Sequence, residues 1–175
     1  MITPAWCRVM AAYNAEMNRR LYAAADAMTD ADRRAERGAF WGSLHGTLSH
    51  LLWGDRMWMS RIAAWPRPPV GMSGSATMIE AWDALKAARI DADAKIKSWA
   101  ATVTDDALSG DLTWFSGAAN RELTRPMSAI LMHVFNHQTH HRGQAHCLIT
   151  QAGQRVEDTD LAFILPPSIF EAAHA

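Results

Sequence analysis

The fold is decided by one stretch, Met132-His133-Val134-Phe135-Asn136-His137-Gln138-Thr139-His140-His141-Arg142-Gly143-Gln144, which holds four of the chain's eight histidines. In an α-helix, successive residues are about 100° apart around the axis. With His133 at zero, His137 lies at roughly 40° and His141 at roughly 80°, one turn apart on one face. His140 and His146 lie off that face. The same face carries four apolar residues, Ile130, Val134, Ala145 and Leu148.

Two histidines one turn apart on an apolar face allow two interpretations. They are hydrogen-bonded core histidines, or they are two ligands of a metal ion, because this spacing lets two imidazoles converge on one ion. Burying both rings without a shared partner is costly. His50 lies in a similar setting on an earlier predicted helix, with Thr47 and Gly54 leaving room beside it. His50, His137 and His141 are therefore able to supply three nitrogens to one ion.

The totals suit a single globular domain over residues 1–175, since 49% of the residues are hydrophobic and 20% are charged. The formal net charge of -1 gives no reason to propose nucleic acid or an acidic membrane as a partner. No apolar run approaches the ~18 residues of a membrane span, and the N-terminus lacks the pattern of a signal peptide. We therefore expect a soluble, cytoplasmic protein that binds neither nucleic acid nor membrane.

The two cysteines, Cys7 and Cys147, are far apart in the sequence and give weak support for a disulfide. Reduced thiols are the default expectation. Cys147 falls about 120° behind His141 on the helical wheel, which argues against a role as a metal ligand.

Capping signals and apolar spacing predict four long helices, over residues of about 4–28, 40–64, 77–101 and 126–152. Thr3-Pro4 opens the first, the capping box Thr77-Met78-Ile79-Glu80 opens the third, and Gly153 ends the fourth. The predicted buried stripes include Phe40 in the second helix and Ile90 in the third. Asn14 and Asn18 lie near the first stripe, where we expect hydrogen bonds at the helix boundary.

The segments between the helices complete the architecture. Residues 65–75 are rich in proline and form a long connection between the second and third helices. Residues 112–115 and 121–124 flank a glycine-containing stretch and allow a short hairpin before the fourth helix. We expect residues 160–166 to pack back on the helices and the last few residues to be loose. The prediction is an all-α four-helix bundle, an architecture that commonly holds metal sites between facing helices.

Two motifs give the chain a resemblance to the DinB/YfiT-like family of proposed metalloenzymes. The first is His50-Leu51-Leu52-Trp53-Gly54-Asp55-Arg56-Met57-Trp58; the second is Asn136-His137 with His141-Arg142-Gly143-Gln144. Tyr13-Asn14 and the Trp114 segment are also similar to that family, so the resemblance covers nearly the whole chain. It implies a four-helix bundle with a divalent metal, zinc or nickel, held by His50, His137 and His141. It also implies a homodimer, and in some relatives a low-molecular-weight thiol as cosubstrate.

Other residues near the predicted site allow more than one role. His133 and His140 are surface or supporting histidines, or they take part in acid–base chemistry near the metal. Gln144 is placed to orient an imidazole. Asp55 and Arg56 are expected to form a solvated or interhelical charge pair. Arg142 points away from the histidine face and is expected to make a dimer or loop contact, and Gly143 is expected to allow close approach of a neighbouring helix.

Three histidines on a divalent ion leave a coordination position for water or substrate, whereas structural zinc sites usually have four protein ligands. The sequence therefore favours a metal-dependent hydrolase or thiol-transferase acting on a small molecule. Two alternatives stay open: a non-catalytic bundle in which the metal joins two helices, and histidines that bind no metal.

Overall fold

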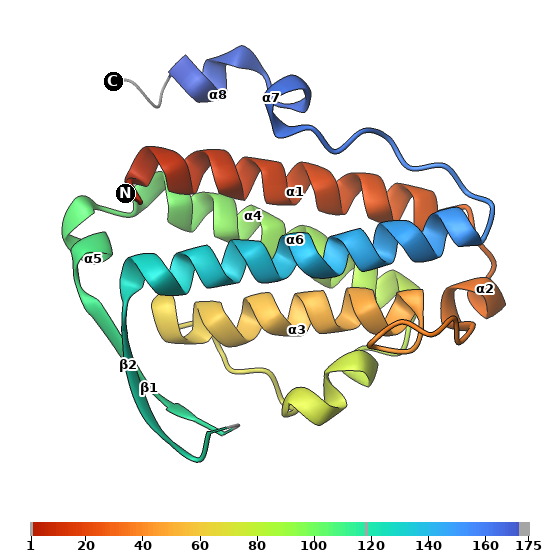
Figure 1. Cartoon of the computed structure of the whole chain (residues 1–175), viewed down its shortest axis with the longest axis horizontal. Helices are drawn as coiled ribbons and strands as arrows, with labels where there is room; N and C mark the ends of the chain where they lie inside the picture. Colours follow the sequence, from red (N-terminus) through yellow and green to blue (C-terminus); the bar gives the residue numbers. More distant parts are fainter. Residues whose placement is uncertain (1, 118, 172–175) are drawn as a thin grey trace.

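The computed structural model describes residues 2–117 and 119–171, and within them four long helices lie side by side (Figure 1). They are α1 (Pro4–Asp26), α3 (Leu44–Ile62), α4 (Trp82–Thr102) and α6 (Met127–Gln151). Both α1 and α3 contact α4 and α6, so each long helix has two long neighbours. The predicted helical class is confirmed. The shorter elements are α2 (Asp30–Arg34), the 3-10 helix η1 (Met72–Thr77), α5 (Asp105–Ser109), β1 (Asp111–Ser116), β2 (Arg121–Pro126), α7 (Leu161–Ile164) and α8 (Pro167–Glu171).

The first two long helices begin at side-chain caps. Thr3 accepts a hydrogen bond from the Trp6 amide, as the sequence predicts, and Ser43 accepts one from the amide of Gly46. The prediction that the second helix starts near Phe40 was wrong. Gly42 has a φ of +75° and turns the chain, so the helix begins only after it. Phe40 consequently lies outside the helix and is 76% exposed.

The predicted capping box of the third helix was also wrong, because α4 begins at Trp82. Thr77 belongs to η1, where its hydroxyl donates to the Gly74 carbonyl oxygen at 3.5 Å instead of capping a helix. Ile90, predicted to be buried, is 71% exposed, whereas Leu85 and Ile96 of the same helix are buried.

The predicted hairpin is confirmed as an antiparallel pair of β1 and β2, with Trp114 opposite Leu123. Ala118, which lies between the two strands in the sequence, is outside the described residues. The predicted glycine stop of α6 is confirmed too. Gly153 has a φ of +80° and donates to Thr150 O, and Gln154 donates to Ile149 O, which together form a Schellman motif.

After α6 the chain turns back and runs along α1 (Figure 1). Tyr13 Oη donates to the Thr159 carbonyl oxygen at 2.8 Å, and Arg20 donates to that of Asp158 at 2.9 Å. Leu165 is buried, which confirms the predicted packing of this segment, although Phe163 is exposed. The terminal residues predicted to be loose fall within 172–175, outside the described residues.

A charged network is buried among the four long helices. Arg89 pairs with Asp55 at 2.7 Å and with Asp93 at 2.9 Å, and Asn18 Nδ2 donates to Asp93 at 2.9 Å. Burial raises the pKa of both carboxyls, against the lowering effect of Arg89. Asp55 was expected to pair with Arg56, either in solvent or between helices. It does form an interhelical pair, but its partner is Arg89.

Asn14 and Asn18 were predicted to lie at the boundary of α1, but both are fully buried. The buried face of α1 includes both amides, because Asp93 and Arg142 offer them hydrogen-bond partners inside the protein. Within the residues described, the structure has no helix with both the length and the apolar character needed to span a membrane.

Candidate metal centre

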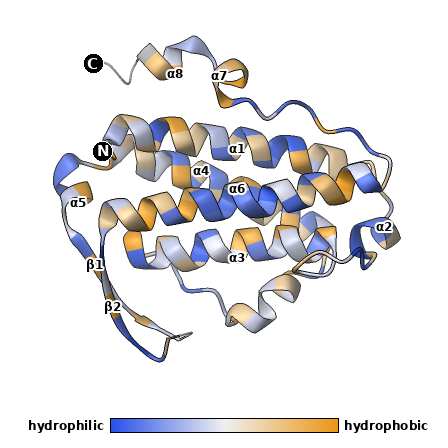
Figure 2. Ribbon diagram, in the orientation of Figure 1, coloured by the Kyte–Doolittle hydropathy of each residue, from blue (hydrophilic) through white to orange (hydrophobic). Residues whose placement is uncertain are grey.

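The middle of α6 is hydrophilic, although more hydrophobic turns lie on either side of it (Figure 2). This is the histidine-rich stretch, and the predicted apolar residues Ile130, Val134, Ala145 and Leu148 are all buried. His141 is buried and His137 is half-buried. Two histidines of α6 therefore lie on its inner face, at the level where α3 packs against it.

His50 of α3 meets these two histidines. Its Nε2 lies 3.1 Å from His137 Nε2, and its ring centroid is 4.8 Å from that of His141. The His137 and His141 centroids are 4.5 Å apart. One nitrogen from each of the three residues lies within 4.8 Å of the other two. The structure thus brings together the three histidines that the sequence singled out.

Hydrogen bonds at the outer nitrogens orient two of the rings. His141 Nδ1 lies 2.7 Å from Gln144 Oε1, and His50 Nδ1 lies 2.8 Å from Ser75 Oγ. An amide oxygen only accepts, so His141 Nδ1 carries the proton and the neutral ring has its lone pair on Nε2. Histidines that bind metals in proteins commonly have their second nitrogen held in this way.

Packing restricts the rings further. His50 stacks on two indoles, with centroid distances of 3.8 Å to Trp41 and 5.5 Å to Trp53. The His137 ring lies against Gly54, where an added Cβ would come within 3.1 Å of His137 Cε1. Glycine at position 54 therefore makes the space that the sequence predicted near His50, and the ring of His137 uses it.

The environment keeps the three rings neutral. Burial, together with the neighbouring imidazoles, lowers the pKa of His50 to about 3 and that of His137 to about 4. Burial also lowers the pKa of His141, partly offset by Gln144. Neutral imidazoles keep the lone pairs that a metal ion needs.

These residues fit a divalent metal. Two nitrogens bound tetrahedrally at a zinc–nitrogen distance of about 2.05 Å are about 3.3 Å apart, close to the 3.1 Å between the Nε2 atoms of His50 and His137. Three imidazole nitrogens form a donor set that suits zinc and nickel. His50, His137 and His141 would hold the ion, and it would connect α3 to α6.

The other two histidines of the motif, His133 and His140, lie at the edge of the cluster and are exposed. The ring centroid of His140 is 4.8 Å from that of His141, and the centroid of His133 is 5.8 Å from that of His137. Neither belongs to the group of three whose nitrogens converge. His133 also makes an edge contact with Trp58, at 5.1 Å.

An aromatic cluster continues from His133 toward the hairpin. Trp58 of α3 contacts Trp114 of β1 with ring centroids 5.5 Å apart. The guanidinium carbon of Arg61 lies 4.6 Å from the Trp58 ring centroid and 5.7 Å from that of Trp114. The hairpin therefore contributes a tryptophan to the surface beside the histidines.

Arg142 was expected to contact a loop or a second copy, and Gly143 to allow close approach of a neighbouring helix; the expectation for Gly143 was wrong. Arg142 is buried inside the chain, where it donates to Asn14 Oδ1 and lies over the Tyr13 ring. It therefore joins α6 to α1. Gly143 is exposed, and a Cβ added to it meets no atom within 4 Å, so no neighbouring helix approaches it.

Three residues that support the site were missed from the sequence. Trp41 and Ser75 come from connections outside the long helices, and only the fold brings them to His50. Gln138 is fully buried next to His137 and donates to α3. The only signal for Gln138 in the sequence was its polar side chain beside the predicted apolar face of α6.

Comparison with known proteins agrees with this fold. The chain is similar to a DinB-like protein from Bacillus cereus ATCC 10987 in its crystal structure, with a TM-score of 0.52 and 23% sequence identity. The match covers 84% of this chain and 91% of that protein. No curated protein matches the sequence. The model of the DinB family matches residues 1–168, and the chain therefore belongs to the DinB family.

Proposed function

We propose that the protein is a metal-dependent enzyme that uses the three-histidine site for hydrolysis of a small electrophile or for its reaction with a low-molecular-weight thiol. The observation that carries this proposal is the convergence of three imidazoles. His50 Nε2 lies 3.1 Å from His137 Nε2, and His141 belongs to the same cluster. A zinc or nickel ion bound there supplies Lewis acidity and lowers the pKa of a coordinated water or thiol.

The chain's own residues then supply orientation and proton transfer. Gln144 holds His141 in the tautomer that presents Nε2, and Ser75 holds His50. His133 and His140 are exposed and border the cluster, which suits a group that accepts a proton from the attacking water or thiol. The attacking oxygen or sulfur forms a bond to the electrophilic carbon, and the leaving group departs with the electron pair of the bond that breaks.

The aromatic cluster supports a substrate with a flat or anionic part. Trp58 and Trp114 offer ring faces beside His133. Arg61 stacks on both and forms no ion pair within the part of the chain that the structure describes. A planar guanidinium over indoles is a suitable partner for a carboxylate or phosphate.

Activity of the zinc- and nickel-loaded protein toward esters, and toward thiols paired with electrophiles, tests this proposal. His137→Ala is expected to remove the metal and the activity while the protein stays folded. His140→Ala and His133→Ala are expected to retain the metal, and the one that accepts the proton loses turnover by about 10²–10⁴-fold. Absence of turnover across the panel by fully loaded protein would contradict the enzyme hypothesis.

A second candidate is a non-catalytic protein in which the ion joins α3 to α6. Its support is that His50 comes from α3 and the other two histidines from α6. It predicts that metal removal lowers the melting temperature and that no substrate of the panel is turned over.

A further inference from the structure

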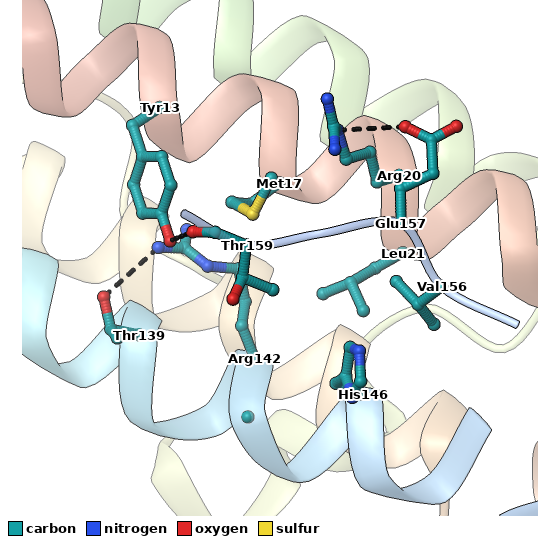
Figure 3. A pocket seen from close by; sticks show the side chains of 11 residues that line it. Tyr13, Met17, Arg20, Leu21, Thr139, Arg142, His146, Val156, Glu157 and Thr159 are labelled. Carbon is teal, nitrogen blue, oxygen red and sulfur yellow. Dashed lines mark hydrogen bonds and ion pairs between the residues drawn. The ribbon is translucent and has the colours of Figure 1, made fainter. Parts of the chain in front are cut away.

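A cavity lies on the opposite side of α6 from the histidine cluster. It has a volume of about 270 Å³ and is bordered by α1, α6 and residues 156–159 of the segment that returns along α1 (Figure 3). Arg20 holds this wall in place through Glu157, at 3.2 Å, and Tyr13 holds it through Thr159. The cavity is therefore built from three separate parts of the chain.

A buried cation lines this cavity. Arg142 is 5% exposed, and its guanidinium donates to Asn14 Oδ1 and, at 3.3 Å, to Thr139 Oγ1. Both partners are neutral, and no carboxylate of the described residues lies within ion-pair distance of Arg142. Burial lowers the pKa of Arg142, and Tyr13, Asp55 and Asp93 offset only part of this. A buried charge without a direct ion-pair partner is costly. The one carboxylate that lines the cavity, Glu157, is paired with Arg20.

The remaining walls divide into apolar and polar parts. Met17, Leu21 and Val156 form an apolar side, and His146 lies on the α6 side (Figure 3). Gly143 also lines the cavity. It is an interior residue of helix α6, a position where glycine is less favourable than alanine. An added Cβ meets no atom within 4 Å, so packing inside this chain gives no reason for glycine there. The absence of a side chain keeps the cavity open.

We propose that this cavity binds a small organic carboxylate, with the carboxylate against Arg142 and the apolar part against Met17, Leu21 and Val156. Guanidinium and carboxylate are complementary in charge and in hydrogen-bonding geometry. The ligand supplies the direct ion-pair partner that Arg142 lacks among the described residues. The volume lies just below the usual range for ligand pockets, which restricts the ligand to a few non-hydrogen atoms beyond the carboxylate.

Thermal unfolding of the metal-free protein with butyrate and benzoate, and with the neutral butyramide and benzamide, tests this proposal. Use of the metal-free protein separates the result from the proposed metal chemistry. At ten times its dissociation constant, a bound acid is expected to raise the melting temperature by roughly 3 to 6 °C. The amides are expected to leave it unchanged.

Two variants identify the site. Gly143→Leu fills the open space and is expected to abolish the shift while the protein folds, and Arg142→Met removes the charge and is expected to do the same. If Arg142→Met does not fold, Gly143→Leu decides. The proposal is overturned if neither acid shifts the wild type, if acids and amides act equally, or if Gly143→Leu keeps the full response.

Discussion

Gln138 Nε2 lies 2.7 Å from Asp55 Oδ1, within the buried interface between α6 and α3. The same amide nitrogen lies 3.0 Å from the Leu51 carbonyl oxygen. These bonds fix α6 against α3. Gln138 directly follows His137 in the sequence, and Asp55 directly follows Gly54. The alignment of His50 with the two histidines of α6 therefore depends on a neutral side chain that does not itself belong to the histidine cluster.

Replacing Gln138 by leucine is expected to lower the free energy of unfolding by about 1–3 kcal/mol, since Asp55 and Leu51 each lose a buried hydrogen-bond donor. Urea unfolding measures this loss, and metal titration is expected to show weaker binding. Gln151→Leu, at an exposed position of the same helix, is the control and is expected to change neither. Equal stability of the two variants would show that the Gln138 bonds contribute nothing.

Replacing Gly54 by alanine is expected to weaken metal binding by about 10–100-fold, a range typical of changes beside the ligands. The new Cβ would lie 3.1 Å from His137 Cε1 and push the ring away from His50. Gly143→Ala is the matched control, because its Cβ meets open space. It is expected to bind metal normally and to be slightly more stable, since alanine is the better helix former. Metal affinity measured by competition with a chelating dye distinguishes the two variants.

The metal-free protein is expected to lose stability as the pH falls from 7 to 5. The pKa of His50 is lowered to about 3 and that of His137 to about 4, whereas histidine in the unfolded chain has a pKa of about 6.5. Below pH 6.5 the unfolded state therefore takes up protons that the folded state does not, and each of the two histidines costs at most about 2 kcal/mol by pH 5.

Urea unfolding at several pH values measures this dependence. His50→Gln is expected to flatten it, because one of the two strongly shifted histidines is gone. A free energy of unfolding that is constant between pH 7 and 5 would contradict the burial of neutral histidines.

The sequence predicted those parts of the site that lie within one helix. The spacing of His137 and His141 needs only the helical repeat, and the apolar residues around them are buried as expected. His50 was found from its helical setting and from the family motif. The four long helices and the hairpin followed from apolar spacing and turn residues.

The parts that were not predicted depend on contacts between distant segments. Trp41 stacks on His50 only because a turn at Gly42 places it there, and the same turn moves Phe40 out of the helix. Asn14 and Asn18 are polar, so the sequence placed them at a boundary, whereas partners on α6 and α4 allow them to be buried. Such partners are not visible in a helical wheel of α1 alone.

The metal content of untagged protein tests the central claim most directly. After dialysis against zinc or nickel and removal of loose metal, elemental analysis is expected to find one ion per chain. His137→Ala, with an unchanged circular dichroism spectrum, is expected to retain almost none, because two imidazoles on separate helices remain. Wild-type protein that retains neither metal in stoichiometric amount would show that His50, His137 and His141 are core histidines instead.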